Sequence, residues 1–100
     1  MDVKTRIDNL LKEHKVVLFM KGTAQFPMCG FSARAVAILK DLKVPFHDVN
    51  VLDDEEIRQG IKEYGNWPTI PQLYINQKLV GGSDIMMEMY HDGELQGLLA

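Results

Sequence analysis

A chain of 100 residues is long enough for one hydrophobic core, so we expect a single domain spanning residues 1–100. The composition is 46% hydrophobic and 25% charged, which is typical of a globular protein and excludes disordered and fibrous classes. The net charge is −3 with Lys and Arg scattered along the chain, which argues against a nucleic-acid partner. No apolar run approaches the ~18 residues that span a bilayer, so we expect no membrane partner either.

The first half of the chain predicts two helices and two strands in alternation. Apolar residues on one face predict a helix over 3–13, and the continuous apolar run 16–20 predicts a strand buried on both faces. Glycine and proline place a loop at 21–28. A stripe of apolar residues at helical spacing then predicts a helix over 30–42, followed by a strand over 46–51. This strand–helix–strand order implies a parallel pair with a right-handed crossover.

The second half predicts a helix, a hairpin and two closing helices. Asp53–Asp54 offers an N-cap for a helix that ends near Tyr64. Strands over 72–75 and 78–80 flank a two-residue turn, which predicts an antiparallel hairpin. Ser83 is the expected N-cap of a helix that ends near His91, and a last short helix follows. The expected fold class is therefore α/β, with a small mixed sheet flanked by helices.

Cys29 is the only cysteine, so no internal disulfide framework can form and a reducing compartment is the simplest setting. We expect the cytoplasm, or an organelle matrix where a targeting segment has been removed. Cys29 falls where a loop enters a helix, and the unpaired N–H groups there stabilise a thiolate. The helix dipole contributes only ~0.3–1 kcal/mol, less than one pKa unit, so a nearby cation must supply the rest. Lys21 is the candidate.

The alternative interpretation is that Cys29 is a small buried hydrophobe, which is a common role for a lone cysteine. Its place at a helix start, after a loop that contains proline, favours the reactive role.

Four segments of this chain together resemble the monothiol, CGFS-type glutaredoxins of the thioredoxin-like superfamily. They are Lys21-Gly22-Thr23, Cys29-Gly30-Phe31-Ser32, Trp67-Pro68-Thr69-Ile70-Pro71-Gln72 and Gly81-Gly82-Ser83-Asp84. The resemblance covers essentially the whole chain and implies a three-layer sandwich around a four-stranded mixed sheet. Two departures are Ala24, where a proline is common, and Ser83, where some members carry a second cysteine.

The resemblance implies a glutathione site with two charged ends. Lys21 and Arg58 would meet the glycine carboxylate of the tripeptide. The N–H groups of Ser83 and Asp84 would hold the γ-glutamyl carboxylate, as a helix N-terminus does for anions, and the Asp84 carboxylate would pair with the amine. Ordinary solvated surface charge is the alternative for Lys21 and Arg58.

The middle of the implied site is a backbone contact. Ile70 precedes Pro71, which is a cis proline in this family, and the N–H and C=O of Ile70 would meet the ligand as a strand would. Trp67 lies in the same segment, where simple packing is the alternative to a contact with the ligand.

Ligand counting connects the single thiolate with the [2Fe–2S] cluster that the resemblance implies. Such a cluster takes four ligands, commonly thiolates, and this chain supplies Cys29 alone. Two chains and two bound glutathiones supply all four, so we expect a homodimer bridged by the cluster rather than by a large apolar patch. The resemblance also implies cluster transfer to recipient apoproteins and pairing with BolA-like proteins.

The alternative function is glutathione-dependent thiol–disulfide exchange. Ser32 stands where a dithiol relative carries its resolving cysteine, so Cys29 would need a second glutathione to complete a cycle. The resemblance suggests that this monothiol route is weak in CGFS members.

Overall fold

The sheet of this protein has four strands in the order β2-β1-β3-β4, with β1 (Val16–Met20) at its centre. The computed structural model describes residues 1–100. β1 pairs in parallel with β2 (His47–Asn50) and antiparallel with β3 (Gln72–Ile75). β4 (Lys78–Gly81) completes the hairpin with β3. The predicted mixed sheet is therefore confirmed.

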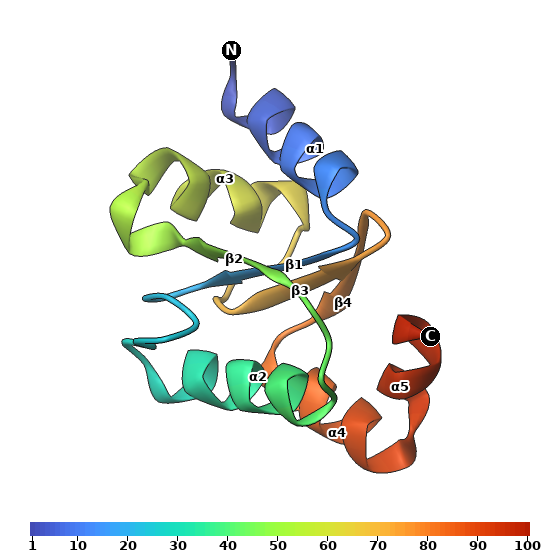
Figure 1. Ribbon diagram of the computed structural model, residues 1–100. Helices are drawn as coiled ribbons and strands as arrows, with labels where there is room; N and C mark the ends of the chain where they lie inside the picture. Colours follow the sequence, from blue (N-terminus) through green and yellow to red (C-terminus); the bar gives the residue numbers. More distant parts are fainter.

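Helices cover both faces of this sheet. α1 and α3 lie over one face, while α2 and α4 lie over the other with α5 beside α4 (Figure 1). The predicted helices are all present, and several ends differ from the expected bounds by one residue. The helical elements are α1 (Val3–Glu13), α2 (Gly30–Asp41), a short 3-10 turn η1 (Val51–Asp53), α3 (Glu55–Tyr64), α4 (Ser83–Asp92) and α5 (Glu94–Leu99). The expected three-layer α/β sandwich is the observed fold.

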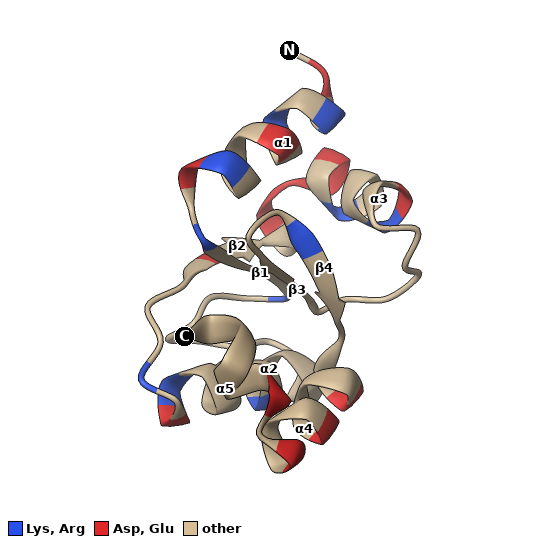
Figure 2. Ribbon diagram, turned by 90° about the vertical axis from the view of Figure 1, so that its right-hand side faces the viewer, with Lys and Arg blue, Asp and Glu red and all other residues tan.

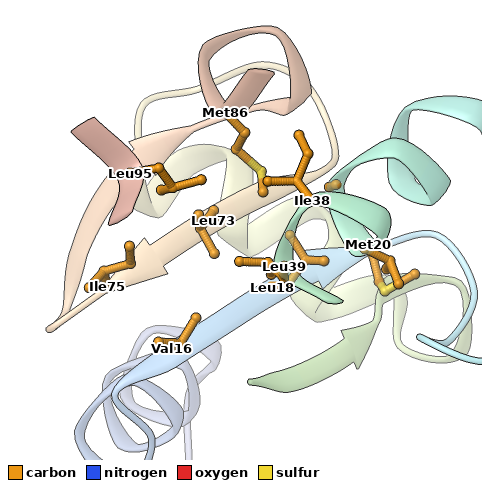
Figure 3. Packing of buried hydrophobic residues seen from close by; sticks show 11 residues of the cluster. Val16, Leu18, Met20, Ile38, Leu39, Leu73, Ile75, Met86 and Leu95 are labelled. Atoms are coloured by element: carbon orange, nitrogen blue, oxygen red, sulfur yellow. The ribbon is translucent and has the colours of Figure 1, made fainter. Parts of the chain in front are cut away.

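The continuous apolar run of β1 is explained by the two cores that it separates. Val16, Leu18 and Met20 belong to the cluster beneath α2 and α4, in which Leu18 is fully buried (Figure 3). Val17 and Phe19 belong to the cluster beneath α1 and α3. Successive side chains of a strand point to opposite faces, so a central strand with helices on both sides is apolar throughout. This burial fixes the end of β1, from which the Cys29 loop departs.

The N-cap of α4 differs from the sequence expectation. Gly82, in extended backbone, is the N-cap, and Ser83 is already the first helical residue. The reason is that the Met86 N–H donates to the Gly82 carbonyl at 3.0 Å, so the first helical hydrogen bond begins one residue earlier than expected. By contrast, the Asp54 side chain caps α3 as predicted, accepting from the Ile57 N–H at 3.2 Å.

Lys and Arg lie beside Asp and Glu along α1 and α3, whereas the charged residues of α4 are Asp and Glu (Figure 2). None of the helices combines the length and the apolar character that a membrane crossing requires.

Replacing Leu18 with Ala removes a fully buried side chain from the central strand. We expect the free energy of unfolding to fall by about 2–5 kcal/mol, because the change loses apolar burial and leaves a cavity. Leu98→Ala is the matched control, since Leu98 is 45% exposed, and it should change stability by less than about 0.5 kcal/mol. Urea unfolding curves measure both variants. Equal midpoints for the two variants would contradict the assignment of Leu18 to the core.

Candidate functional site

A short loop, closed by backbone contacts between its two arms, leads from the end of β1 to Cys29. The Met28 N–H donates to the Lys21 carbonyl at 2.9 Å, and an isolated bridge joins Gly22 to Pro27. The Gly22 N–H donates to the Asn50 side chain at 2.9 Å, and this hydrogen bond connects the loop to the end of β2. Gly22 has φ +91°, and a Cβ there would lie 2.4 Å from a backbone oxygen, so only glycine fits. The loop therefore delivers Cys29 to a defined position.

Cys29 is the N-cap of α2, as predicted, and its side chain makes no capping hydrogen bond. Ser32, in the first turn of α2, is fully buried and accepts a hydrogen bond from the Lys21 backbone N–H at 3.1 Å. The first turn of α2 is thus attached directly to the end of the central strand. The Cys29 thiol is half-buried beside this joint.

The pKa of the Cys29 thiol lies below its ordinary value. Partial burial acts in the opposite direction and is the largest single influence, because it disfavours the charged sulfur. The backbone N–H groups of Ser32 and Phe31, the Ser32 hydroxyl and the Lys21 ammonium all favour the thiolate, and together they outweigh burial. Lys21 thus favours the thiolate, but it is the smallest of these influences. The N–H groups at the helix start lower the pKa more than the lysine, which was expected to be the main contributor.

A cleft of about 420 Å³ opens beside Cys29 and collects most of the expected site residues. Five of the six line it, and Arg58 does not. Arg58 instead lies 3.8 Å from the Glu55 carboxylate on the surface of α3. The thirteen lining residues are Lys21, Cys29, Phe31, Lys62, Trp67, Pro68, Thr69, Ile70, Pro71, Gly82, Ser83, Asp84 and Ile85.

Lys62 is a cleft residue that the sequence interpretation missed. It lies four residues after Arg58 on α3, so both side chains share one face of that helix. The four-residue spacing of Arg58 and Lys62 was the available signal in the sequence. It does not indicate which of the two side chains lines the cleft. With Lys21, this end of the cleft has two lysine ammonium groups.

Gln72 holds the wall formed by residues 67–71. Its side chain is fully buried, and its amide donates to the carbonyls of Trp67 at 3.0 Å and Thr69 at 3.2 Å. The Ile70–Pro71 bond is cis, as the resemblance implied. The indole N–H of Trp67 is buried without a hydrogen-bond partner, close to Gly82. Trp67 thus packs into the cleft wall and also lines the cleft.

The start of α4 forms another part of the cleft wall. Ser83 is buried and Asp84 is exposed there. The first N–H groups of a helix have no partner within the helix, so this end offers donors for an anion. The Asp84 carboxylate lies 3.6 Å from the Arg34 guanidinium of α2.

Large apolar side chains are exposed around Cys29. Phe26 is 73% exposed, Met28 69% and Phe31 56%, and all three lie within three residues of the thiol along the chain. Apolar groups gathered around a reactive atom favour contact with another molecule. The sequence interpretation did not identify this apolar rim, which we define as Phe26, Met28 and Phe31.

Residues 16–80 match the sequence profile of the glutaredoxin family, and this match includes Cys29 and most of the cleft. The chain is also 59% identical over 98 residues to a monothiol glutaredoxin of Synechocystis sp., covering 98% of this chain and 92% of the relative. The chain belongs to the glutaredoxin family. It is a monothiol member, in agreement with its single cysteine.

Two further proteins are similar to this chain, one in sequence and one in structure. A chloroplastic monothiol glutaredoxin of Arabidopsis thaliana is 58% identical over 94 residues, which are 94% of this chain and 54% of that longer relative. A buckwheat glutaredoxin, solved as a complex with glutathione, superposes with a TM-score of 0.86 over 97% of this chain and 86% of the other. At 22% identity the buckwheat structure shows a shared glutaredoxin fold.

The Cys29 thiol should titrate at a lower pH in the folded chain than in the same chain unfolded in urea. Because a thiolate is the form that alkylates, the rate of reaction with iodoacetamide against pH measures the titration midpoint. Lys21→Ala should raise the midpoint by removing a favourable charge, and Ser32→Ala should raise it by removing the hydroxyl. Lys62→Ala should leave it unchanged. The same midpoint for folded and unfolded chains would contradict this electrostatic description.

Proposed function

We propose that this protein, as a single glutaredoxin domain over residues 1–100, binds glutathione and carries a [2Fe–2S] cluster shared with a second copy. The observation that supports this most strongly is one half-buried thiol of lowered pKa at a cleft with lysines at one end and a helix N-terminus at the other. The cargo would be handed on to recipient apoproteins.

The cleft suits glutathione in the charges of its lining residues. The glycine carboxylate would lie against Lys21, with Arg58 and Lys62 of α3 adding positive charge nearby. The middle of the tripeptide would follow the backbone of Ile70, which places its thiol beside Cys29. The γ-glutamyl carboxylate would meet the N–H groups of Ser83 and Asp84. A buckwheat glutaredoxin of the same fold was solved as a complex with glutathione, which supports glutathione as the class of ligand.

The donor set of one chain is too small for a cluster on its own. No three His, Cys, Asp or Glu side chains gather closely enough to hold a metal ion, and Cys29 is the only thiol. A [2Fe–2S] cluster takes four ligands, commonly thiolates. Two Cys29 thiolates and two glutathione thiolates complete the set, so these residues fit the cluster only when two chains and two tripeptides combine.

The apolar rim supports the approach of a second chain. Phe26, Met28 and Phe31 expose more than half of their side chains next to Cys29, and contact with another copy would remove them from water. The expected interface therefore has an apolar border as well as a bridging cluster, which revises the expectation that the cluster bridges it alone. A BolA-like protein in place of the second copy is the alternative partner.

Half of the proposed ligands belong to a diffusible tripeptide, so the cluster would be released more easily than one held by four protein thiolates. Such lability suits a carrier. The proposed setting is a reducing compartment, either the cytoplasm or an organelle matrix. The single free thiol supports it, and the Arabidopsis relative is chloroplastic by name.

The second candidate function is thiol–disulfide exchange, which the lowered pKa of Cys29 favours. In this reaction the Cys29 thiolate attacks the glutathione sulfur of a mixed disulfide, that S–S bond breaks, and the substrate thiolate leaves. A second glutathione thiolate then attacks the glutathione sulfur on Cys29, which releases oxidised glutathione and restores the Cys29 thiolate. Both steps use the same cleft.

Charge removal at either end of the cleft should weaken glutathione binding. Asp84→Ala, Arg58→Ala and Lys62→Ala should each raise the dissociation constant by about three- to tenfold, because each removes an attraction to a charged end of the tripeptide. Titration calorimetry on the reduced chain measures this effect. Lys12→Ala, which removes an exposed charge from α1, is the control. Unchanged binding in all three of these variants would contradict the proposed orientation.

Cys29→Ser should abolish cluster assembly and the associated dimer. Anaerobic reconstitution with iron, sulfide and glutathione, followed by visible absorption and size-exclusion chromatography, measures both. The unchanged chain should form a coloured dimer only when glutathione or another small thiol is present. A cluster that assembles fully on monomeric protein or on Cys29→Ser would overturn the carrier proposal and favour the exchange enzyme.

A further inference from the structure

Arg34 and Asp84 form an ion pair at the α4 end of the cleft, where the proposed function puts the γ-glutamyl group. The Arg34 Nη1 atom, on α2, lies 3.6 Å from the Asp84 Oδ1 atom, on α4. Asp84 lines the cleft, whereas Arg34 borders it through this contact. The two residues are 50 positions apart in the chain, and the packing of α2 against α4 brings them together.

The γ-glutamyl group of glutathione is a zwitterion, because one carbon atom carries both an ammonium and a carboxylate. An anion on this end of the cleft serves the ammonium only. A neighbouring cation serves the carboxylate and reduces the repulsion between that carboxylate and Asp84. The Arg34–Asp84 pair therefore presents the two charges that the ligand requires, in opposite sign and side by side.

We propose that Arg34 is a specificity-determining residue that contacts the γ-glutamyl carboxylate while Asp84 contacts the ammonium. This inference rests on the proposed glutathione binding and adds a side-chain cation to the N–H groups of Ser83 and Asp84. The pair would favour a γ-glutamyl peptide over a peptide that lacks either charge at this end.

The opposite effect, in which Arg34 competes with the ammonium for Asp84, is weak on this geometry. The Arg34 side chain is 46% exposed and that of Asp84 is 87% exposed. Water screens such a pair strongly, and exposed ion pairs contribute little to stability. At 3.6 Å the contact is also longer than a hydrogen bond between charged groups. Arg34 therefore remains available to a carboxylate.

A comparison of three tripeptides on two variants separates these effects. The ligands are glutathione, glutaryl-Cys-Gly, which lacks the amine, and 4-aminobutanoyl-Cys-Gly, which lacks the γ-glutamyl carboxylate. Each is titrated calorimetrically into the reduced full-length chain, into Arg34→Gln and into Lys12→Gln. Lys12 is exposed on α1, so the second variant controls for the loss of one positive charge. Thermal unfolding of Arg34→Gln should match that of the unchanged chain, because Arg34 lies at the surface.

Arg34→Gln should bind glutathione and glutaryl-Cys-Gly about two- to fivefold more weakly, the range expected for an exposed ion pair. It should bind 4-aminobutanoyl-Cys-Gly as the unchanged chain does, since that ligand has no carboxylate for Arg34. An equal loss for all three ligands, an unchanged affinity for glutathione or a gain in that affinity would each overturn the inference. If the unchanged chain does not bind glutathione at all, the proposed function itself fails.

Discussion

The hydrogen bond from the Lys21 backbone N–H to the Ser32 hydroxyl is the interaction on which this site depends. It attaches the end of the central strand to the first turn of α2, and Cys29 lies between the two attachment points. Because Ser32 is fully buried, water does not compete for this bond. The same hydroxyl also lowers the pKa of the Cys29 thiol. Ser32, which the resemblance aligns with the resolving cysteine of dithiol relatives, thus helps to position Cys29.

The cleft extends this arrangement across the molecule, because each of its walls comes from a different element. Gln72 secures the segment that contains Ile70, the end of β1 supplies Lys21, and the start of α4 supplies Ser83 and Asp84. The two ends differ in charge, so an elongated ligand with charged ends has one favoured direction. The Cys29 thiol lines the same cleft, where such a ligand would present its own sulfur. The proposed glutathione binding and the proposed cluster sharing would then be two uses of one geometry.

Local sequence patterns predicted the helices and strands well, because these elements depend on interactions between residues that are close in the chain. The apolar run of β1 indicated burial on both faces, and Asp54 indicated the start of α3. Features that depend on how helices are rotated and packed were not predictable. Lys62 reaches the cleft because Ile57 and Ile61 set the orientation of α3 on the sheet. No local sequence pattern could indicate that Lys62 lines the cleft.

The apolar rim and the Arg34–Asp84 pair are two further features that could not be predicted from the sequence. An apolar loop residue such as Phe26 is normally expected to be buried, and only the fold shows it exposed beside Cys29. In the sequence, Arg34 and Asp84 are two separate charged residues, and only the packing of α2 on α4 makes them neighbours. The position of Cys29 at a helix start was predictable from the sequence, whereas the surface around it was not.

The central claim is that two chains and two glutathiones together hold one cluster, and native mass spectrometry of anaerobically reconstituted protein tests it most directly. We expect a single dominant complex whose mass equals two chains, two glutathiones, two irons and two sulfides. Mild activation should release the glutathiones and the cluster together and leave bare single chains. A cluster-bearing dimer without glutathione, or a cluster on a single chain, would contradict the claim.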